Sequence, residues 1–284
     1  MKNTGRIKKT SFLKILVIFF VLIICLRVVD YFGSSDSPPE YPEYEMADIK
    51  EEININEVYQ GKMDKKTQEF LFYQTGLGKE GIETLCEECE SSAELLNRLK
   101  FYQEQLFFGT EETQMVSLKN GDVLVSLSQR FFYYHHGHAA IVIDGVENTI
   151  LEAKSYRAGS CVGTTKKWST ISSFVVLRLK EEVIREYEEK EHINPAESAA
   201  VYAARNLDGL KYSLLKDLRP LSDTTLEYTQ CAHLVWYAYY ACGLDIDENR
   251  GFIIKPRDFL KSDVFEVVQV YGMSPKELLE IQNE

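Results

Sequence analysis

Residues 229–240 read Thr-Gln-Cys-Ala-His-Leu-Val-Trp-Tyr-Ala-Tyr-Tyr, and the rest of the chain is organised around this stretch. Small and apolar side chains recur there at i, i+3, i+4, i+7, i+10 and i+11, namely Cys231, Leu234, Val235, Ala238, Ala241 and Cys242. This spacing predicts a helix that buries one face. We expect Thr229 to cap its N-terminus and Gly243 to follow its C-terminus. Cys231 should then lie in the first helical turn.

The position of Cys231 fits two interpretations. Unpaired N–H groups and the positive end of the dipole at a helix N-terminus favour a thiolate, which suits a nucleophile. A cysteine on an apolar stripe is, however, more often a small core residue than a catalyst. A catalytic role for Cys231 therefore depends on partners elsewhere in the chain.

Composition limits the classes of function. The chain has 284 residues, 45% hydrophobic and 27% charged, which is ordinary for one or two folded domains. Its formal net charge of −12 argues against general nucleic-acid binding, which needs a basic surface. The sequence carries no indication of oligomeric state.

The N-terminus predicts a membrane partner. Basic residues precede an apolar segment, Phe12 to Val29, that is near the lower length limit for a spanning helix. Because the basic side stays cytoplasmic, residues 1–30 are expected to form a single-pass anchor with the C-terminal domain extracytoplasmic. Secretion after cleavage of a signal peptide is the alternative, although no convincing small-x-small cleavage site follows.

The remaining chain divides into three expected segments. Residues 31–45, rich in proline, serine and acids, predict a linker, and residues 46–115 predict a helical extension interrupted by glycines. Residues 116–284 predict an α+β domain. Its expected strands are 123–127, 139–143, 149–153, 174–179 and one near Val267, and its expected helices are 196–206, capped by Asn194, and the Cys231 helix. Cys86 and Cys89 form a C-x-x-C pair, interpreted as a local disulfide or two ordinary helix cysteines.

His138 and Glu152 are the candidate partners of Cys231. A thiol nucleophile needs an imidazole, and the imidazole needs an orienting acceptor. His138 begins one expected strand and Glu152 ends the next, after an Asp144-Gly145 turn. A three-residue loop would pair His138 with Glu152, whereas a two-residue loop would pair His138 with Leu151 and turn one side chain away. The sequence allows either register.

Five short motifs in a fixed order carry a resemblance: Gly121-Asp122-Val123, Gly137-His138-Ala139-Ala140-Ile141-Val142, Ile150-Leu151-Glu152-Ala153, Gly209-Leu210-Lys211-Tyr212 and Cys231-Ala232-His233-Leu234-Val235. Over roughly residues 117–265 the chain resembles the circularly permuted, papain-like NlpC/P60 cysteine hydrolases of the YiiX/YebB type. The resemblance implies an antiparallel sheet packed on the cysteine-bearing helix. The expected fold is this α+β domain together with an N-terminal transmembrane helix and the helical extension.

The resemblance also implies roles. Cys231 would be the nucleophile, His138 the base and Glu152 the orienting carboxylate. Tyr212 matches the tyrosine of the G-x-x-Y segment and would bind substrate. The family often has tyrosine directly before the cysteine; here Tyr228 is the nearest one and is the second expected substrate-binding residue. The family usually has serine where this chain has alanine, directly after the cysteine.

The expected function is a membrane-anchored extracytoplasmic cysteine hydrolase, an amidase or peptidase that cleaves an amide or ester, on cell-wall peptides. One alternative is a lipid acyl hydrolase or acyltransferase, because lecithin:retinol acyltransferase-like enzymes are also similar to this group. Another is a non-catalytic module that binds a lipid or wall fragment. We expect no cofactor and no metal, since a zinc site of His136, His138 and Glu152 would leave Cys231 without a role.

Overall fold

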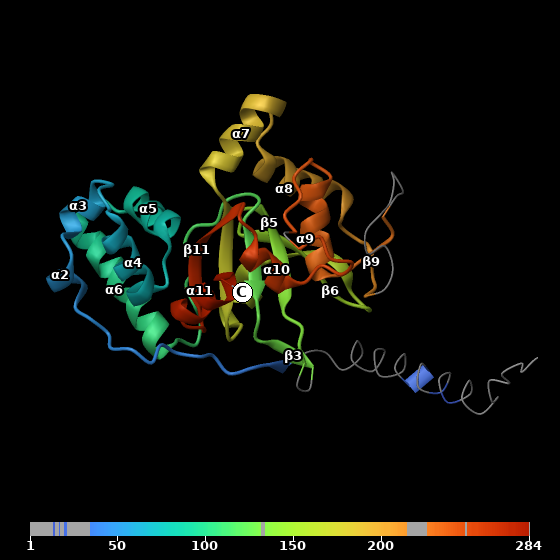
Figure 1. The fold of residues 1–284 in the computed structure, drawn as a ribbon, viewed down its shortest axis with the longest axis horizontal. Helices are drawn as coiled ribbons and strands as arrows, with labels where there is room; N and C mark the ends of the chain where they lie inside the picture. The colour runs from blue at the N-terminus through green and yellow to red at the C-terminus, as the bar shows by residue number, and fades with distance from the viewer. Residues whose placement is uncertain are drawn as a thin grey trace, which may run out of the picture.

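An antiparallel sheet of six strands forms the centre of the molecule (Figure 1). A computed structural model describes residues 35–131, 134–214, 226–247 and 249–283, with the isolated positions 14, 17, 20 and 21. The strand order across the sheet is β11-β8-β2-β5-β6-β7. The strands are β2 (Val123–Ser126), β5 (His138–Asp144), β6 (Thr149–Ser155), β7 (Gly159–Thr164), β8 (Phe174–Leu179) and β11 (Phe265–Tyr271).

Helices cover both faces of this sheet. Since successive strand residues point to opposite sides, each strand contributes side chains to two cores. In β2, Leu124 packs into one core with the N-terminal helices, whereas Val123 and Val125 pack into a second core with α8 and α9. The N-terminal layer consists of α2 (Ile49–Glu52), α3 (Ile55–Tyr59), α4 (Lys65–Thr75), α5 (Lys79–Glu88) and α6 (Ser92–Phe108). The opposite layer contains α8 (Pro195–Asn206) and α9 (Cys231–Tyr240).

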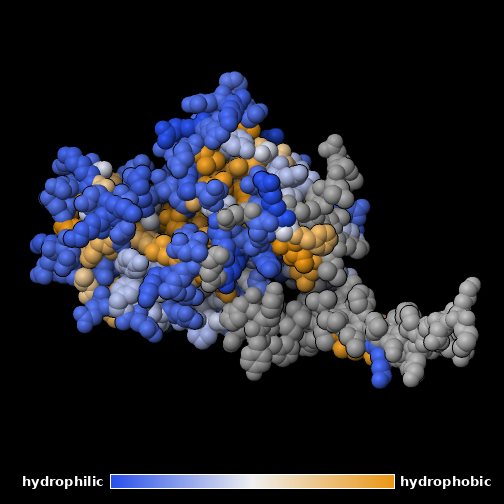
Figure 2. All heavy atoms as spheres, viewed as in Figure 1, coloured by the Kyte–Doolittle hydropathy of each residue, from blue (hydrophilic) through white to orange (hydrophobic). Residues whose placement is uncertain are grey.

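The remaining elements lie at the edges. Helix α7 (Glu181–Glu191) projects from the body, and Figure 2 shows a hydrophilic surface there. The short elements are β1 (Ser35–Asp36), β3 (Gln129–Phe131), β4 (Tyr134–His135), the 3-10 helix η1 (Thr165–Thr170), β9 (Lys211–Tyr212), β10 (Tyr228–Thr229), α10 (Pro256–Lys261) and α11 (Pro275–Asn283).

Two glycines let the N-terminal layer approach the sheet closely. Gly76 ends α4 with φ of 71°, and its carbonyl accepts from Val270 N at 2.7 Å. A Cβ on Gly78 would lie 1.8 Å from the carbonyl oxygen of Val267 in β11. The segment between α4 and α5 therefore runs along β11, and the helices form a layer of the fold.

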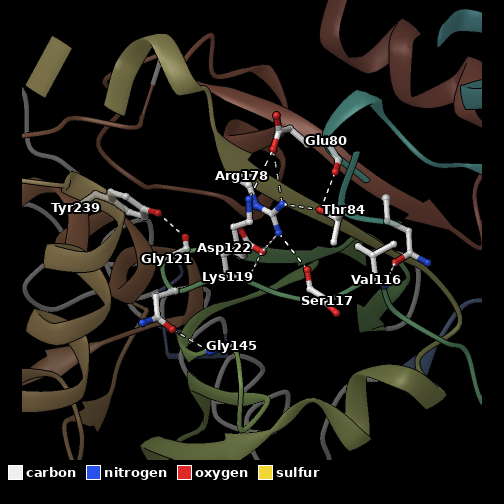
Figure 3. Close-up of polar contacts among 12 residues, drawn as sticks. Glu80, Thr84, Val116, Ser117, Lys119, Gly121, Asp122, Gly145, Arg178 and Tyr239 are labelled. Carbon is white, nitrogen blue, oxygen red and sulfur yellow. Dashed lines mark hydrogen bonds and ion pairs between the residues drawn. The ribbon is translucent and has the colours of Figure 1, made fainter. Parts of the chain in front are cut away.

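A buried ion pair also joins these layers (Figure 3). Arg178 of β8 donates to both carboxylate oxygens of Asp122, at 2.9 and 2.7 Å, and to Thr84 of α5 at 3.3 Å. It also donates to the carbonyl of Ser117. Every one of these partners is a protein group, so this network serves to connect strands and helix.

The structure corrects one part of the expected fold, the N-terminal transmembrane helix. Phe12–Val29 lies largely outside the described residues. Among the helices of the described residues, none is long and apolar enough to cross a membrane. Even α6, the longest, carries Glu94, Arg98, Lys100 and Glu104. The fold is α+β with an antiparallel sheet, and the division of the chain into domains stays a prediction.

Candidate active site

Helix α9 begins at Cys231, but a different residue from the expected one caps it. The side-chain oxygen of Gln230 accepts from Ala232 N at 3.0 Å and from Cys231 Sγ at 3.5 Å. Its amide nitrogen donates to the carbonyl of Ile254 at 2.8 Å, which holds the side chain in place. Thr229, the expected cap, instead has its hydroxyl 3.1 Å from His233 Nδ1. Glutamine is not a preferred N-cap, and the fixed contact with Ile254 explains why it serves here.

The burial of α9 is wider than one stripe. His233, Trp236 and Tyr239 are buried, as are four of the positions first identified, namely Cys231, Leu234, Val235 and Ala238. His233 lies 2% exposed with its ring stacked on Tyr237. The helix ends at Tyr240, and Ala241 is exposed rather than part of the buried face.

His138 and Glu152 contact each other across β5 and β6. Nε2 of His138 lies 2.6 Å from Oε2 of Glu152, and both side chains are buried. The register is neither of the two considered: Ile141 pairs with Leu151, and a bulge follows Val142. This register differs from direct His138–Glu152 pairing by two residues. An even shift keeps both side chains on the same face.

Cys231 belongs to the same cluster. Its side chain is close enough to His138 to raise the pKa of the imidazole, although the two residues belong to α9 and β5. The pairing of β5 with β6 stops at Ile141, so the two strands separate at the end where His138 lies. Sulfur, imidazole and carboxylate therefore lie together, and each of the three residues is less than a tenth exposed.

The electrostatics of this cluster favour an ion pair. Burial alone would lower the pKa of His138, but Cys231 and Glu152 outweigh it and raise this pKa to about 9. Burial alone would raise the pKa of Glu152, but His138 and Lys154 outweigh it and lower this pKa to about 2. At neutral pH the pair is imidazolium and carboxylate.

Trp168 of η1 forms a wall of the site. Its ring stacks on the imidazole of His138, with centroids 5.5 Å apart and an interplanar angle of 19°. Trp168 is fully buried, so it shields one face of the imidazole from water. Sequence reasoning missed Trp168 and Gln230, since neither lies near His138 along the chain.

The two expected substrate-binding tyrosines lie on the short paired strands β9 and β10, next to the segment that leads into Cys231. Tyr212 of β9 pairs with Thr229 of β10, and Tyr228 pairs with Lys211. Both tyrosines are half-buried, and the Lys211 ammonium lies 5.5 Å from the ring centroid of Tyr228. Tyr228 precedes Cys231 by three residues, and Tyr212 pairs with Thr229, which precedes it by two. Contact of either tyrosine with a substrate stays a prediction.

Metal ligation finds no support at this site. In the part of the chain that the structure describes, no group of three or more His, Cys, Asp or Glu residues is arranged to hold a metal ion. His136, part of the zinc alternative, has Nδ1 2.7 Å from the carbonyl oxygen of Gly137. Cys86 and Cys89 are free thiols, so a local disulfide is not formed.

A cleft of about 510 Å³ is lined by residues that adjoin the candidate site in sequence. His136 and Gly137, which directly precede His138, form part of its wall together with Lys255 at the start of α10. Lys255 follows Ile254, the residue that holds Gln230. His138, Glu152 and Cys231 themselves are not among the residues that line this cleft.

Comparisons with models of protein families, with curated proteins and with solved structures found no match to this chain. The resemblance to NlpC/P60 hydrolases therefore stays a prediction.

Proposed function

We propose that the protein is a cysteine hydrolase that cleaves an amide or an ester with Cys231, His138 and Glu152. The observation that carries this proposal is the buried cluster in which His138 Nε2 lies 2.6 Å from Glu152 Oε2 and Cys231 is close enough to raise the pKa of His138. The cluster joins three residues that are far apart in the sequence. Its order is the one that nucleophilic catalysis by a thiol requires.

The reaction follows from these contacts. The Cys231 thiolate attacks the carbonyl carbon, forms a C–S bond and moves an electron pair to the carbonyl oxygen. The backbone N–H of Cys231, at the start of α9, can stabilise this oxyanion. Collapse breaks the C–N or C–O bond while His138 gives its proton to the leaving atom. His138 then takes a proton from water, hydroxide cleaves the thioester, and the acid leaves.

The substrate class is proposed from the resemblance. Cell-wall peptides are the first candidate and lipid acyl esters the second, since both kinds of substrate occur among the similar enzymes. This is an argument by analogy, and the site itself fits either carbonyl. Incubating the protein with muropeptides and with short-chain acyl esters, and measuring which is consumed, distinguishes the two.

Labelling with a thiol-directed acyloxymethyl ketone tests the reaction type. The full-length chain should take up one label, located at Cys231 by peptide mass spectrometry. Cys231→Ala should abolish labelling, and Cys161→Ala, which removes another half-buried thiol, should leave it intact. Labelling that persists in Cys231→Ala, or that is spread evenly over the cysteines, would contradict the proposal and favour a non-catalytic binding module.

A further inference from the structure

Glu152 has a second charged partner that the three-residue site does not use. Lys154 lies two residues further along β6, where the register of β6 with β7 shifts. Its Nζ is 3.1 Å from Oε1 of Glu152, whereas Oε2 contacts His138. Each carboxylate oxygen is thus held by a different positively charged group.

The neighbouring strand β7 leaves room for this ammonium. A Cβ added to Gly163 would lie 3.4 Å from Lys154 Nζ and 3.7 Å from Glu152 Oε1. Cys161, opposite Glu152 in the β6–β7 ladder, is close enough to Lys154 to raise the pKa of its ammonium. The ammonium therefore lies beside both β6 and β7.

Burial separates this ion pair from an ordinary surface pair. The Lys154 side chain is 32% exposed, but the Glu152 side chain is only 2% exposed. Exposed pairs contribute little, because water solvates both charges. Glu152 is shielded from water, so without Lys154 its Oε1 would lose a charged partner in a buried place.

We propose that Lys154 is a positioning residue: by holding Oε1 of Glu152 it fixes the carboxylate so that Oε2 orients His138 toward Cys231. This inference rests on the proposed function, and it extends the site by a fourth residue that does not touch the substrate. The lowered pKa of Glu152, to which Lys154 contributes after His138, agrees with the geometry.

The test compares Lys154→Met, Lys154→Arg and Lys190→Met in the full-length chain, with p-nitrophenyl acetate as substrate. Lys190 is the matched control, since its ion pair with Glu186 on α7 is exposed. We expect Lys154→Met to lower kcat about ten-fold, as misplaced catalytic groups do, with KM nearly unchanged. Lys154→Arg should restore most of the rate, and Lys190→Met should match wild type.

A second measurement separates positioning from mere stability. The acid titration midpoint of Glu152, followed through its carboxyl carbon by NMR, should rise in Lys154→Met because a positive neighbour is lost. It should stay near the wild-type value in Lys154→Arg. A loss of stability alone would lower the melting temperature without moving this midpoint. Should Lys154→Met fail to fold, Lys154→Gln, which also removes the charge, replaces it in both measurements.

The outcomes are distinct. A kcat for the charge-removing variant close to that of wild type, with Cys231→Ala inactive, would overturn the role of Lys154 and leave the proposed function standing. The same loss in Lys154→Arg as in Lys154→Met would also overturn it. Equal turnover by wild type and Cys231→Ala would remove the proposed function, and the role of Lys154 with it.

Discussion

Replacing Glu152 by glutamine tests whether the carboxylate sets the charge of His138. The substitution keeps the size of the side chain and an oxygen that can accept, but removes the negative charge. His138 would then be buried beside a neutral amide, and burial lowers the pKa of histidine. We expect the pKa of His138 to fall from about 9 by at least about one unit, because an opposite charge shifts a neighbour's pKa by about 1–3 units.

The same shift determines how stability depends on pH. A rise in the pKa of His138 from 6.5 to about 9 is worth on the order of 3 kcal/mol for the protonated form, shared between Glu152 and Cys231. Because the folded-state pKa is raised, this stability is fully present below pH 6.5 and is lost as pH rises through 9. For Glu152 the pKa is lowered, so its contribution is present above pH 4.5 and is lost as pH falls through 2.

Urea unfolding of reduced protein between pH 5 and pH 10 measures this dependence. Wild type should lose stability between pH 6.5 and 9 relative to Glu152→Gln, whose curve should be flatter over that interval. The His138 ring signal, assigned with His138→Gln, gives the pKa directly. Glu186→Gln removes the exposed partner of Lys190 and is the control, which should follow wild type. Parallel stability curves for wild type and Glu152→Gln, with the same His138 midpoint, would refute the reasoning.

Two further predictions concern the join between sheet and helices. Arg178→Met leaves the Asp122 carboxylate buried without its guanidinium, so the free energy of unfolding measured in urea should fall by about 3–5 kcal/mol. Replacing Asp122 by asparagine in the same variant should recover part of this loss. No recovery would contradict the ion-pair account. Gly78→Ala brings a Cβ to 1.8 Å from the Val267 carbonyl oxygen, so the melting temperature measured by circular dichroism should fall clearly. Gly209→Ala is the control: it has open space around it, and its positive φ should lower the melting temperature by a smaller amount.

The sequence predicts elements whose signals are local. The strand at Phe174–Leu179 and the helix capped by Asn194 are confirmed, the latter through hydrogen bonds to the N–H groups of Ala196 and Glu197. The start of the helix at Cys231 is confirmed too. Hydrophobic alternation and capping chemistry act over a few residues, which is why these elements can be found without knowing the fold.

The features that the sequence does not predict depend on distant segments. The β5–β6 register requires a bulge after Val142 and a positive φ at Asn148, and neither has a distinctive local pattern. Gln230 caps α9 because Ile254 holds it, and Trp168 reaches His138 from beyond β7. The contact of Lys154 with Glu152 does not follow from alternation along β6, because the register with β7 shifts at this residue.

Two buried charge networks in this protein differ in a way that bears on function. In the Arg178 network the guanidinium donates to carboxylate, hydroxyl and carbonyl groups of the protein, none of which is a thiol. The Cys231 network has a thiol at one end and the partly exposed Lys154 at the other. Burial is costly for both, and pairing of charges offsets the cost in each. A role in connecting strands and helix is enough to account for the Arg178 network. The same role does not account for the thiol in the Cys231 network. If Cys231 reacted with iodoacetamide no faster than Cys161, this reason for assigning chemistry to the second network would be lost.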